Sequence, residues 1–184
     1  MRQTRFNTQA MVAAALLSAI GVAIPMFSPI KIIIGPASYT LASHVPIFIA
    51  MFLSPSIAAS VSLITTIGFF LGGFPLVIVL RALTHLVFAI IGALILRRFK
   101  TILSNPTQCV LFSALISAIH AACEVAAVAP FYYGGTLGGA SYSSGFFVTV
   151  VLLVGIGSFV HSMLDFTIAK WIWHIIFIPK QRKQ

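Results

Sequence analysis

The stretch YTLASHVPIFIAMFLSPS, residues 39–56, is apolar enough for the interior of a membrane, yet it carries His44 and, two residues later, Pro46. A titratable ring and a residue that interrupts helices are both costly inside a lipid bilayer. The simplest explanation would be that this stretch lies outside the membrane. The composition of the whole chain excludes that explanation.

The chain is too apolar for a water-soluble protein. Of its 184 residues, 60% are hydrophobic and 7% charged, and the mean hydropathy is +1.10. Soluble domains carry about 25% charged residues, so we predict an integral membrane protein. The formal net charge of +9 would suggest nucleic acid in a soluble chain. Here the basic residues lie at the ends of apolar segments, so we expect contact with the lipid bilayer and none with nucleic acid.

Six apolar segments approach the roughly 20 residues that a membrane-spanning helix needs. We therefore predict an all-α polytopic membrane protein with six transmembrane helices, forming a single domain over residues 1–184. The predicted helices cover residues 9–27, 39–53, 56–71, 76–96, 107–129 and 145–178.

Basic residues gather before the first segment, after the fourth and after the sixth. Cytoplasmic loops of membrane proteins carry an excess of Lys and Arg. Six spans would place all three clusters on one side, so we expect both termini in the cytoplasm. The clusters consist of Arg2 and Arg5, of Arg97, Arg98 and Lys100, and of Lys180, Arg182 and Lys183.

Polar residues inside the segments occur in pairs four residues apart, and such pairs share one helix face. A charge at the bilayer centre costs about 2.5–3.5 kcal/mol, so these side chains are expected to face a cavity or a partner. Pro46 would free the carbonyl of Ala42 to line such a cavity. The pairs are Arg81 with His85, His120 with Glu124, and His161 with Asp165.

Counting residues from the segment ends gives the expected depth of each polar side chain. His44, Arg81 and Glu124 fall near the outer end, His85 and His120 fall one turn deeper, and His161 falls near the middle with Asp165 below it. We predict an outward-facing substrate pocket lined by His44, Arg81, His85, His120 and Glu124. Alternatively, Arg81 and Glu124 only neutralise each other and hold two helices in register. Asp165 is expected to be structural.

Two predicted outer loops differ in kind. Residues 28–40 are too apolar for a solvated linker, so this loop is expected to fold back over something. Residues 130–145, PFYYGGTLGGASYSSG, contain tyrosines that either stack on a flat ligand or anchor the loop at the membrane interface.

The sequence lacks the motifs that are typical of several functions. The sequence has no G-x-x-x-x-G-K-[ST] loop, so ATP binding of that type is not expected. No nucleophile elbow is evident, so we expect neither an enzyme nor catalytic residues. Cys109 and Cys123 match no zinc or redox spacing. We expect no metal and no cofactor.

Two motifs carry a resemblance to a known family. Residues 11–22, MVAAALLSAIGV, place Ala15 and Ala19 four apart, a spacing that lets another helix approach closely. Residues 42–55, ASHVPIFIAMFLSP, open the second segment, with Ser54-Pro55 where the family pattern has Gly-Pro. With the six segments, these features resemble the substrate-binding S component of an energy-coupling factor (ECF) vitamin transporter over nearly the whole chain.

The resemblance implies a multi-pass protein of the bacterial cell membrane that binds a small vitamin from outside. It also implies docking onto a membrane-embedded T component driven by two ATPases, with Ala15 and Ala19 on the docking surface and both outer loops as lids. The residues leave the ligand open. An aminopyrimidine such as hydroxymethylpyrimidine would use Glu124, whereas a carboxylate such as pantothenate or niacin would pair with Arg81. A stand-alone secondary carrier, a channel and a membrane scaffold protein remain alternatives.

Overall fold

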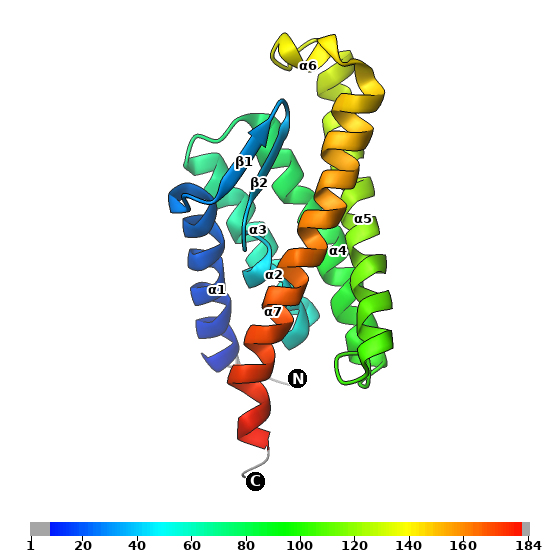
Figure 1. Ribbon diagram of the computed structural model, residues 1–184. Coiled ribbons are helices and arrows are strands. Elements are labelled where there is room, and N and C mark those ends of the chain that lie inside the picture. The colour runs from blue at the N-terminus through cyan, green and yellow to red at the C-terminus, as the bar shows by residue number, and fades with distance from the viewer. Residues whose placement is uncertain (1–7, 182–184) are drawn as a thin grey trace, which may run out of the picture.

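The computed structural model describes residues 8–181, which form a bundle of helices with one short β-hairpin (Figure 1). The hairpin pairs β1 with β2 in antiparallel order. A π-helix, η1, continues directly into α7. The elements are α1 (Thr8–Phe27), β1 (Lys31–Ile34), β2 (Ala37–Thr40), α2 (Val45–Leu53), α3 (Pro55–Leu71), α4 (Leu76–Arg98), α5 (Pro106–Tyr133), α6 (Ala140–Ser143), η1 (Phe147–Ile156) and α7 (Gly157–Gln181).

Four helical stretches in the described part of the chain are long and apolar enough to cross a membrane. These are α1, α4, α5 and the continuous stretch from η1 through α7. The apolar helix α3 has 17 residues and α2 has 9. At 1.5 Å per residue, α2 rises only about 14 Å, roughly half of a hydrocarbon core. The prediction of six transmembrane helices therefore stays a prediction.

The predicted helix over residues 39–53 is wrong in its first part. Residues 37–40 belong to strand β2, and Ala42 turns the chain with a positive φ of 68°. The helix begins only at Val45, and Pro46 lies in its first turn, where a missing N–H costs nothing. The carbonyl of Ala42 accepts a hydrogen bond from the N–H of Val45 at 3.2 Å, so Pro46 does not free it.

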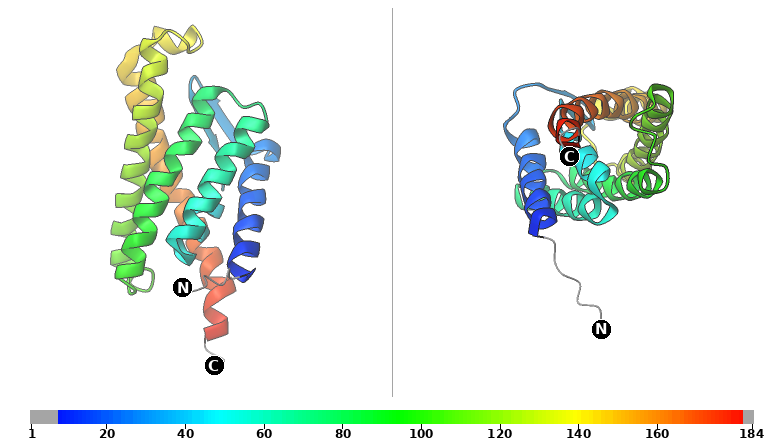
Figure 2. Two further views of the ribbon diagram at one scale, coloured as in Figure 1. Left: turned by 180° about the vertical axis from the view of Figure 1, so that it is seen from behind. Right: turned by 90° about the horizontal axis from the view of Figure 1, so that it is seen from below.

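The helix ends gather at two ends of the bundle. The start of α1, the α4–α5 loop and the end of α7 lie at one end, whereas the hairpin and α6 lie toward the other (Figures 1 and 2). This arrangement agrees with termini on a common side. Which side of the membrane that end faces stays a prediction. Arg2, Arg5, Arg182 and Lys183 lie outside the described residues.

The short helix α2 forms the centre of the core. Seven of its nine residues are buried, as expected for a helix that is apolar on every face. Phe48 packs against Phe88 and Phe166, with ring centroids 5.5 and 5.3 Å apart. Because α2 is short and central, its first residue, which follows His44, lies inside the bundle.

Candidate functional site

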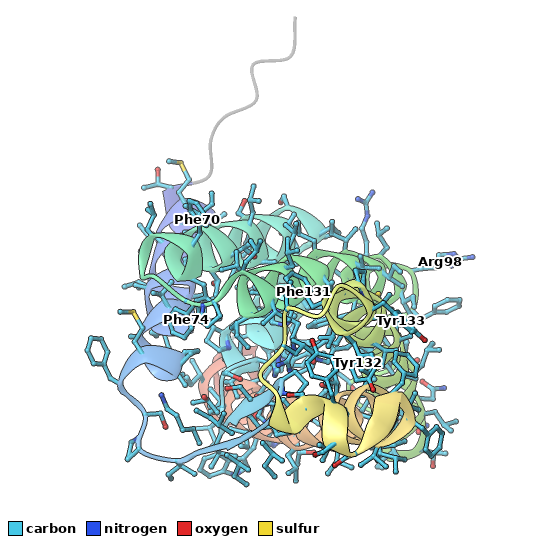
Figure 3. All side chains as sticks on the ribbon, turned by 90° about the horizontal axis from the view of Figure 1, so that it is seen from above. Phe70, Phe74, Arg98, Phe131, Tyr132 and Tyr133 are labelled. Carbon is cyan, nitrogen blue, oxygen red and sulfur yellow. The ribbon has the colours of Figure 1, made fainter. Side chains whose placement is uncertain are left out.

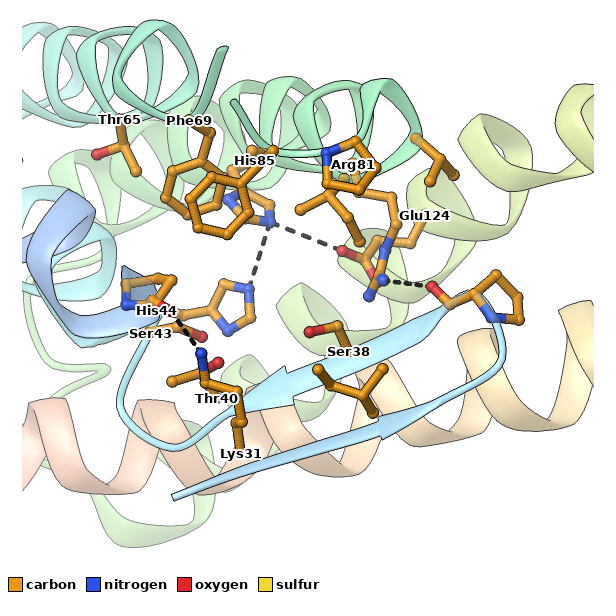
Figure 4. A pocket seen from close by; sticks show the side chains of 18 of the residues that line it. Lys31, Ser38, Thr40, Ser43, His44, Thr65, Phe69, Arg81, His85 and Glu124 are labelled. Carbon is orange, nitrogen blue, oxygen red and sulfur yellow. Dashed lines mark hydrogen bonds and ion pairs between the residues drawn. The ribbon is translucent and has the colours of Figure 1, made fainter. Parts of the chain in front are cut away.

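The β-hairpin folds back over a cavity, which confirms the prediction for the loop at residues 28–40. The cavity has a volume of about 390 Å³ and lies between the hairpin, the start of α2, and helices α3 and α4 (Figure 4). Gly35, at the tip of the hairpin, has a positive φ of 57°, a conformation that glycine adopts readily. The polar side chains along the cavity wall are Lys31, Ser38, Thr40, Ser43, His44, Thr65, Arg81, His85 and Glu124.

Arg81 and Glu124 form a buried ion pair at this wall. Arg81 Nη2 donates to Glu124 Oε2 at 2.7 Å, and Ser158 Oγ donates to the same carboxylate oxygen. Arg81 Nη1 donates to the carbonyl of Pro36, at the hairpin tip, at 2.9 Å. Arg81 Nε has no hydrogen-bond partner among the described residues. The pair thus joins α4, α5 and the hairpin, and both residues also line the cavity.

His44 lies deeper than its position in the sequence suggested. It meets Asp165 rather than Arg81: Asp165 Oδ2 lies 3.1 Å from His44 Nδ1 and accepts the backbone N–H of His44 at 2.9 Å. The other oxygen, Oδ1, accepts the N–H of Ala42 at 2.8 Å. The predicted depth was wrong because a strand and a turn, not a helix, precede Val45.

His85 and His120 pack beside His44. His85 lines the cavity, and its Nε2 lies 3.3 Å from His44 Nε2 and 3.7 Å from Glu124 Oε1. His120 is fully buried behind this wall and does not line the cavity; its ring centroid lies 4.8 Å from that of His44 and 5.0 Å from that of His85. The structure therefore brings His44, Arg81, His85 and Glu124 to one cavity, with His120 directly behind it.

Ala15 and Ala19 lie away from the cavity, on the exposed face of α1. Large apolar neighbours on the same helix are exposed as well, among them Leu16 at 60% and Ile20 at 47%. The opposite face of α1 buries Ser18, Gly21 and Pro25. An exposed face of small and apolar residues suits contact with lipid or with another membrane helix.

Sequence reasoning missed most of the residues that line the cavity, and three of them matter for its chemistry. Lys31, Phe69 and Phe74 line the cavity, and Lys31 Nζ donates to the Pro25 carbonyl at 3.0 Å. The two phenylalanine rings are stacked, with centroids 4.7 Å apart and an interplanar angle of 18°. One signal pointed to Lys31, because it is the only basic residue in the predicted outer loops.

The tyrosines of the loop at residues 130–145 pack on one another. Tyr132 and Tyr133 lie at the end of α5, which extends to residue 133 (Figure 3). The Tyr132 ring contacts those of Tyr142 and Phe146 at centroid distances of 5.1 and 5.3 Å. None of these tyrosines lines the cavity. This arrangement favours the alternative in which the tyrosines anchor the loop at the membrane interface over the one in which they stack on a ligand.

A bundle of apolar helices that enclose a cavity with a paired guanidinium and carboxylate defines a membrane protein that binds a small solute. The chain is 38% identical over 177 residues to the niacin transporter NiaX of Lactococcus lactis subsp. cremoris (strain MG1363), a match that covers 96% of this chain and 78% of NiaX. The chain belongs to the family of substrate-binding S components of ECF vitamin transporters. It is a multi-pass protein of the bacterial plasma membrane. No protein-family model matches the chain, and no solved structure does.

Proposed function

We propose that this S component binds niacin, a pyridine carboxylate, and delivers it to the cell through an ECF T component and two ATPases. The observation that carries the proposal is the guanidinium of Arg81, a largely buried cation at the cavity wall. A guanidinium presents its N–H groups in a fork that matches a carboxylate. The similarity to a niacin transporter supports the same ligand.

The charges around the cavity favour an anion over an aminopyrimidine. Two cations, Lys31 and Arg81, and one carboxylate, Glu124, line it, so an excess of one positive charge remains when the histidines are neutral. Glu124 Oε2 already accepts hydrogen bonds from Arg81 and Ser158. Glu124 therefore has less capacity left to accept the amino group of hydroxymethylpyrimidine.

The apolar part of the cavity suits a flat ring. Phe69 and Phe74 offer an aromatic wall, and aromatic rings pack well face to face with an offset or edge to face. The volume of about 390 Å³ lies at the small end of the range for ligand cavities, about 300–1,000 Å³. Both features support a small heteroaromatic ligand.

Delivery across the membrane needs an energy source, and the chain has no ATP-binding P-loop. We infer that Ala15 and Ala19, which lie on the exposed face of α1, contact the T component. This docking is the part of the proposal that separates an ECF S component from a stand-alone carrier.

Calorimetric titration of the purified protein with four compounds tests the ligand: niacin, nicotinamide, pantothenate and hydroxymethylpyrimidine. Nicotinamide has the same ring with an uncharged amide, so the comparison isolates the carboxylate. A hydrogen bond to a charged group contributes about 1.5–3 kcal/mol, so we expect nicotinamide to bind about 10- to 100-fold more weakly than niacin. Tightest binding of hydroxymethylpyrimidine would contradict the proposal.

Variants test which side chains hold the ligand. Lys31→Met is expected to weaken niacin binding about 10-fold, while Lys100→Met, which removes an exposed charge outside the cavity, should leave it unchanged. Arg81→Ala and Glu124→Ala should each abolish binding, but each leaves its buried partner unpaired. The double variant Arg81→Met with Glu124→Gln removes both charges; if it binds niacin like the wild type, the proposed site is wrong.

A further inference from the structure

Four of the five histidines and both acidic residues of the chain meet in the middle of the bundle. The proposed niacin site uses the part of this cluster nearest the hairpin and leaves the deeper part unexplained. All six side chains come from α4, α5, α7 and the residue before α2, and all are buried. They are His44, His85, His120, His161, Glu124 and Asp165.

Three of these histidines lie close enough together to hold one metal ion. One ring nitrogen from each of His44, His85 and His120 lies within 4.8 Å of the others. The Nε2 atoms of His44 and His85 are 3.3 Å apart, and Figure 4 shows the two rings meeting at the cavity wall. Bonds of about 2.0–2.1 Å to a tetrahedral zinc ion place two nitrogens about 3.3–3.4 Å apart.

Asp165 contacts the ring nitrogen of His44 that faces away from His85, as carboxylates commonly do behind a metal-binding histidine. Its Oδ2 lies 3.1 Å from His44 Nδ1, which holds the proton on Nδ1 and leaves the lone pair of Nε2 directed at His85. Both oxygens of Asp165 also accept backbone N–H groups. Asp165 is therefore engaged within the protein, and it positions a ligand rather than acting as one.

His120 lacks a partner of its own. It is fully buried, and neither ring nitrogen has a hydrogen-bond partner among the described residues. Its Nε2 lies 3.8 Å from Glu124 Oε1, beyond hydrogen-bonding distance. Coordination of a metal ion by His120 would satisfy one nitrogen that is otherwise buried unpaired, a costly state.

The charge balance points the same way. Glu124 is matched by Arg81, but Asp165 contacts only the histidines His44 and His161 among the charged and titratable side chains of the described region. A buried carboxylate without a cation is strongly unfavourable. A divalent cation bound to His44 would supply the missing positive charge.

We propose that His44, His85 and His120 bind one divalent transition-metal ion of the zinc class through their ring nitrogens. Neutral imidazole suits Zn²⁺, Ni²⁺ and Cu²⁺ better than Mg²⁺ or Ca²⁺. Since His44 and His85 line the cavity, a fourth position on that side is left for water or for a nitrogen donor of the ligand. The site departs from the sequence-based expectation of no metal, and it does not depend on niacin being the ligand.

A cobalt titration tests the site directly. The full chain is purified with a tag that contains no histidine, stripped of metal with a chelator and titrated with Co²⁺ in the absence of any vitamin. We expect one Co²⁺ per chain, visible absorption typical of tetrahedral nitrogen ligands, and displacement by Zn²⁺. His85→Gln and His120→Gln should weaken Co²⁺ binding at least 10-fold, whereas His174→Gln, which changes an exposed histidine outside the cluster, should not.

Two results would overturn the proposal. The first is a wild-type protein that takes up neither Co²⁺ nor Zn²⁺ under these conditions. The second is equal Co²⁺ binding by the His120→Gln, His85→Gln and His174→Gln proteins. The histidine cluster would then be held together by hydrogen bonds and would not bind a metal ion. If the variants fail to fold in size-exclusion chromatography, the stoichiometry and spectrum of the wild type decide alone. Because no vitamin is present, failure of niacin binding leaves this result intact.

Discussion

At the scale of single residues, Asp165 shows how a carboxylate buried inside a helix bundle can hold the backbone in place. The first N–H groups of a helix have no partner within that helix, and a polar side chain usually caps them. His44, at the cap position of α2, makes no side-chain capping bond. Asp165, on the neighbouring helix α7, instead accepts the N–H groups of Ala42 and His44, which lie in the turn just before α2. Because α2 starts inside the bundle, we infer that few waters are available to replace it.

Removal of this carboxylate should destabilise the protein. Asp165→Ala leaves two buried N–H groups unpaired, and each costs about 1–3 kcal/mol. We expect a clear fall in the midpoint of thermal unfolding in detergent, and a smaller fall for Asp165→Asn, which keeps one acceptor oxygen. Thr167→Ala, at an exposed position on the same helix, is the control. An Asp165→Ala protein as stable as that control would show that the carboxylate does not hold α2.

At the scale of elements, the sequence predicts the long helices well and the short ones badly. Length and hydropathy locate α1, α3, α4 and α5 to within a few residues, because a lipid-facing helix must be long and apolar. The same criterion fails at residues 39–53, where an apolar stretch that also holds Thr40, Ser43 and His44 contains the end of a strand, a turn and a buried helix. Hydrophobic periodicity cannot separate these cases.

The π-helix η1 shows a second limit of the sequence. Its wider turns leave backbone carbonyls outside the regular pattern, and the Tyr39 hydroxyl of β2 donates to one of them, that of Leu153. This bond joins residues 114 positions apart. The residues 145–178 by themselves contain no sign of a contact with Tyr39. The sequence therefore predicts a regular helix there.

The sequence predicts the contacts of the candidate site within one helix but not those between helices. Residues four apart share a helix face, so Arg81 with His85 and His120 with Glu124 were placed together within each helix. The lengthwise offset between neighbouring helices is set by packing across the bundle. The contact between His44 and Asp165 depends on that offset and on the start of α2 at Val45, and the sequence shows neither.

Helices α1 and α3 pack closely through a glycine on each. A methyl group on Gly21 would lie 2.8 Å from Thr65 Oγ1, and one on Gly68 would overlap Val22. Gly68→Leu should therefore push α1 away from α3 and lower stability by about 1–3 kcal/mol, measured by thermal unfolding. Gly138→Leu, where no neighbouring atom lies within 4 Å, should be close to neutral. Equal melting temperatures for the two variants would contradict close packing here.

At the scale of the whole molecule, the proposed ligand site and the proposed docking face are separate surfaces. The cavity lies under the hairpin, whereas Ala15 and Ala19 lie on the outer face of α1. Variants on one surface should therefore leave the function of the other intact.

Ala15→Trp tests this separation. A bulky ring on the proposed docking face should reduce niacin uptake in cells at least 10-fold, while the purified variant binds niacin like the wild type. Leu111→Trp adds the same ring at a position of α5 that is 66% exposed, and it should transport normally. Normal uptake by the Ala15→Trp protein would count against α1 as the contact with the T component.

The hydrogen bond between Arg81 and the carbonyl of Pro36 has a consequence for the lifetime of the complex. The guanidinium that we propose as the anchor of the carboxylate also holds the tip of the hairpin that lies across the cavity. Departure of the vitamin then waits for the hairpin to lift. The residence time would follow the frequency of that opening more closely than the number of contacts made to the ligand.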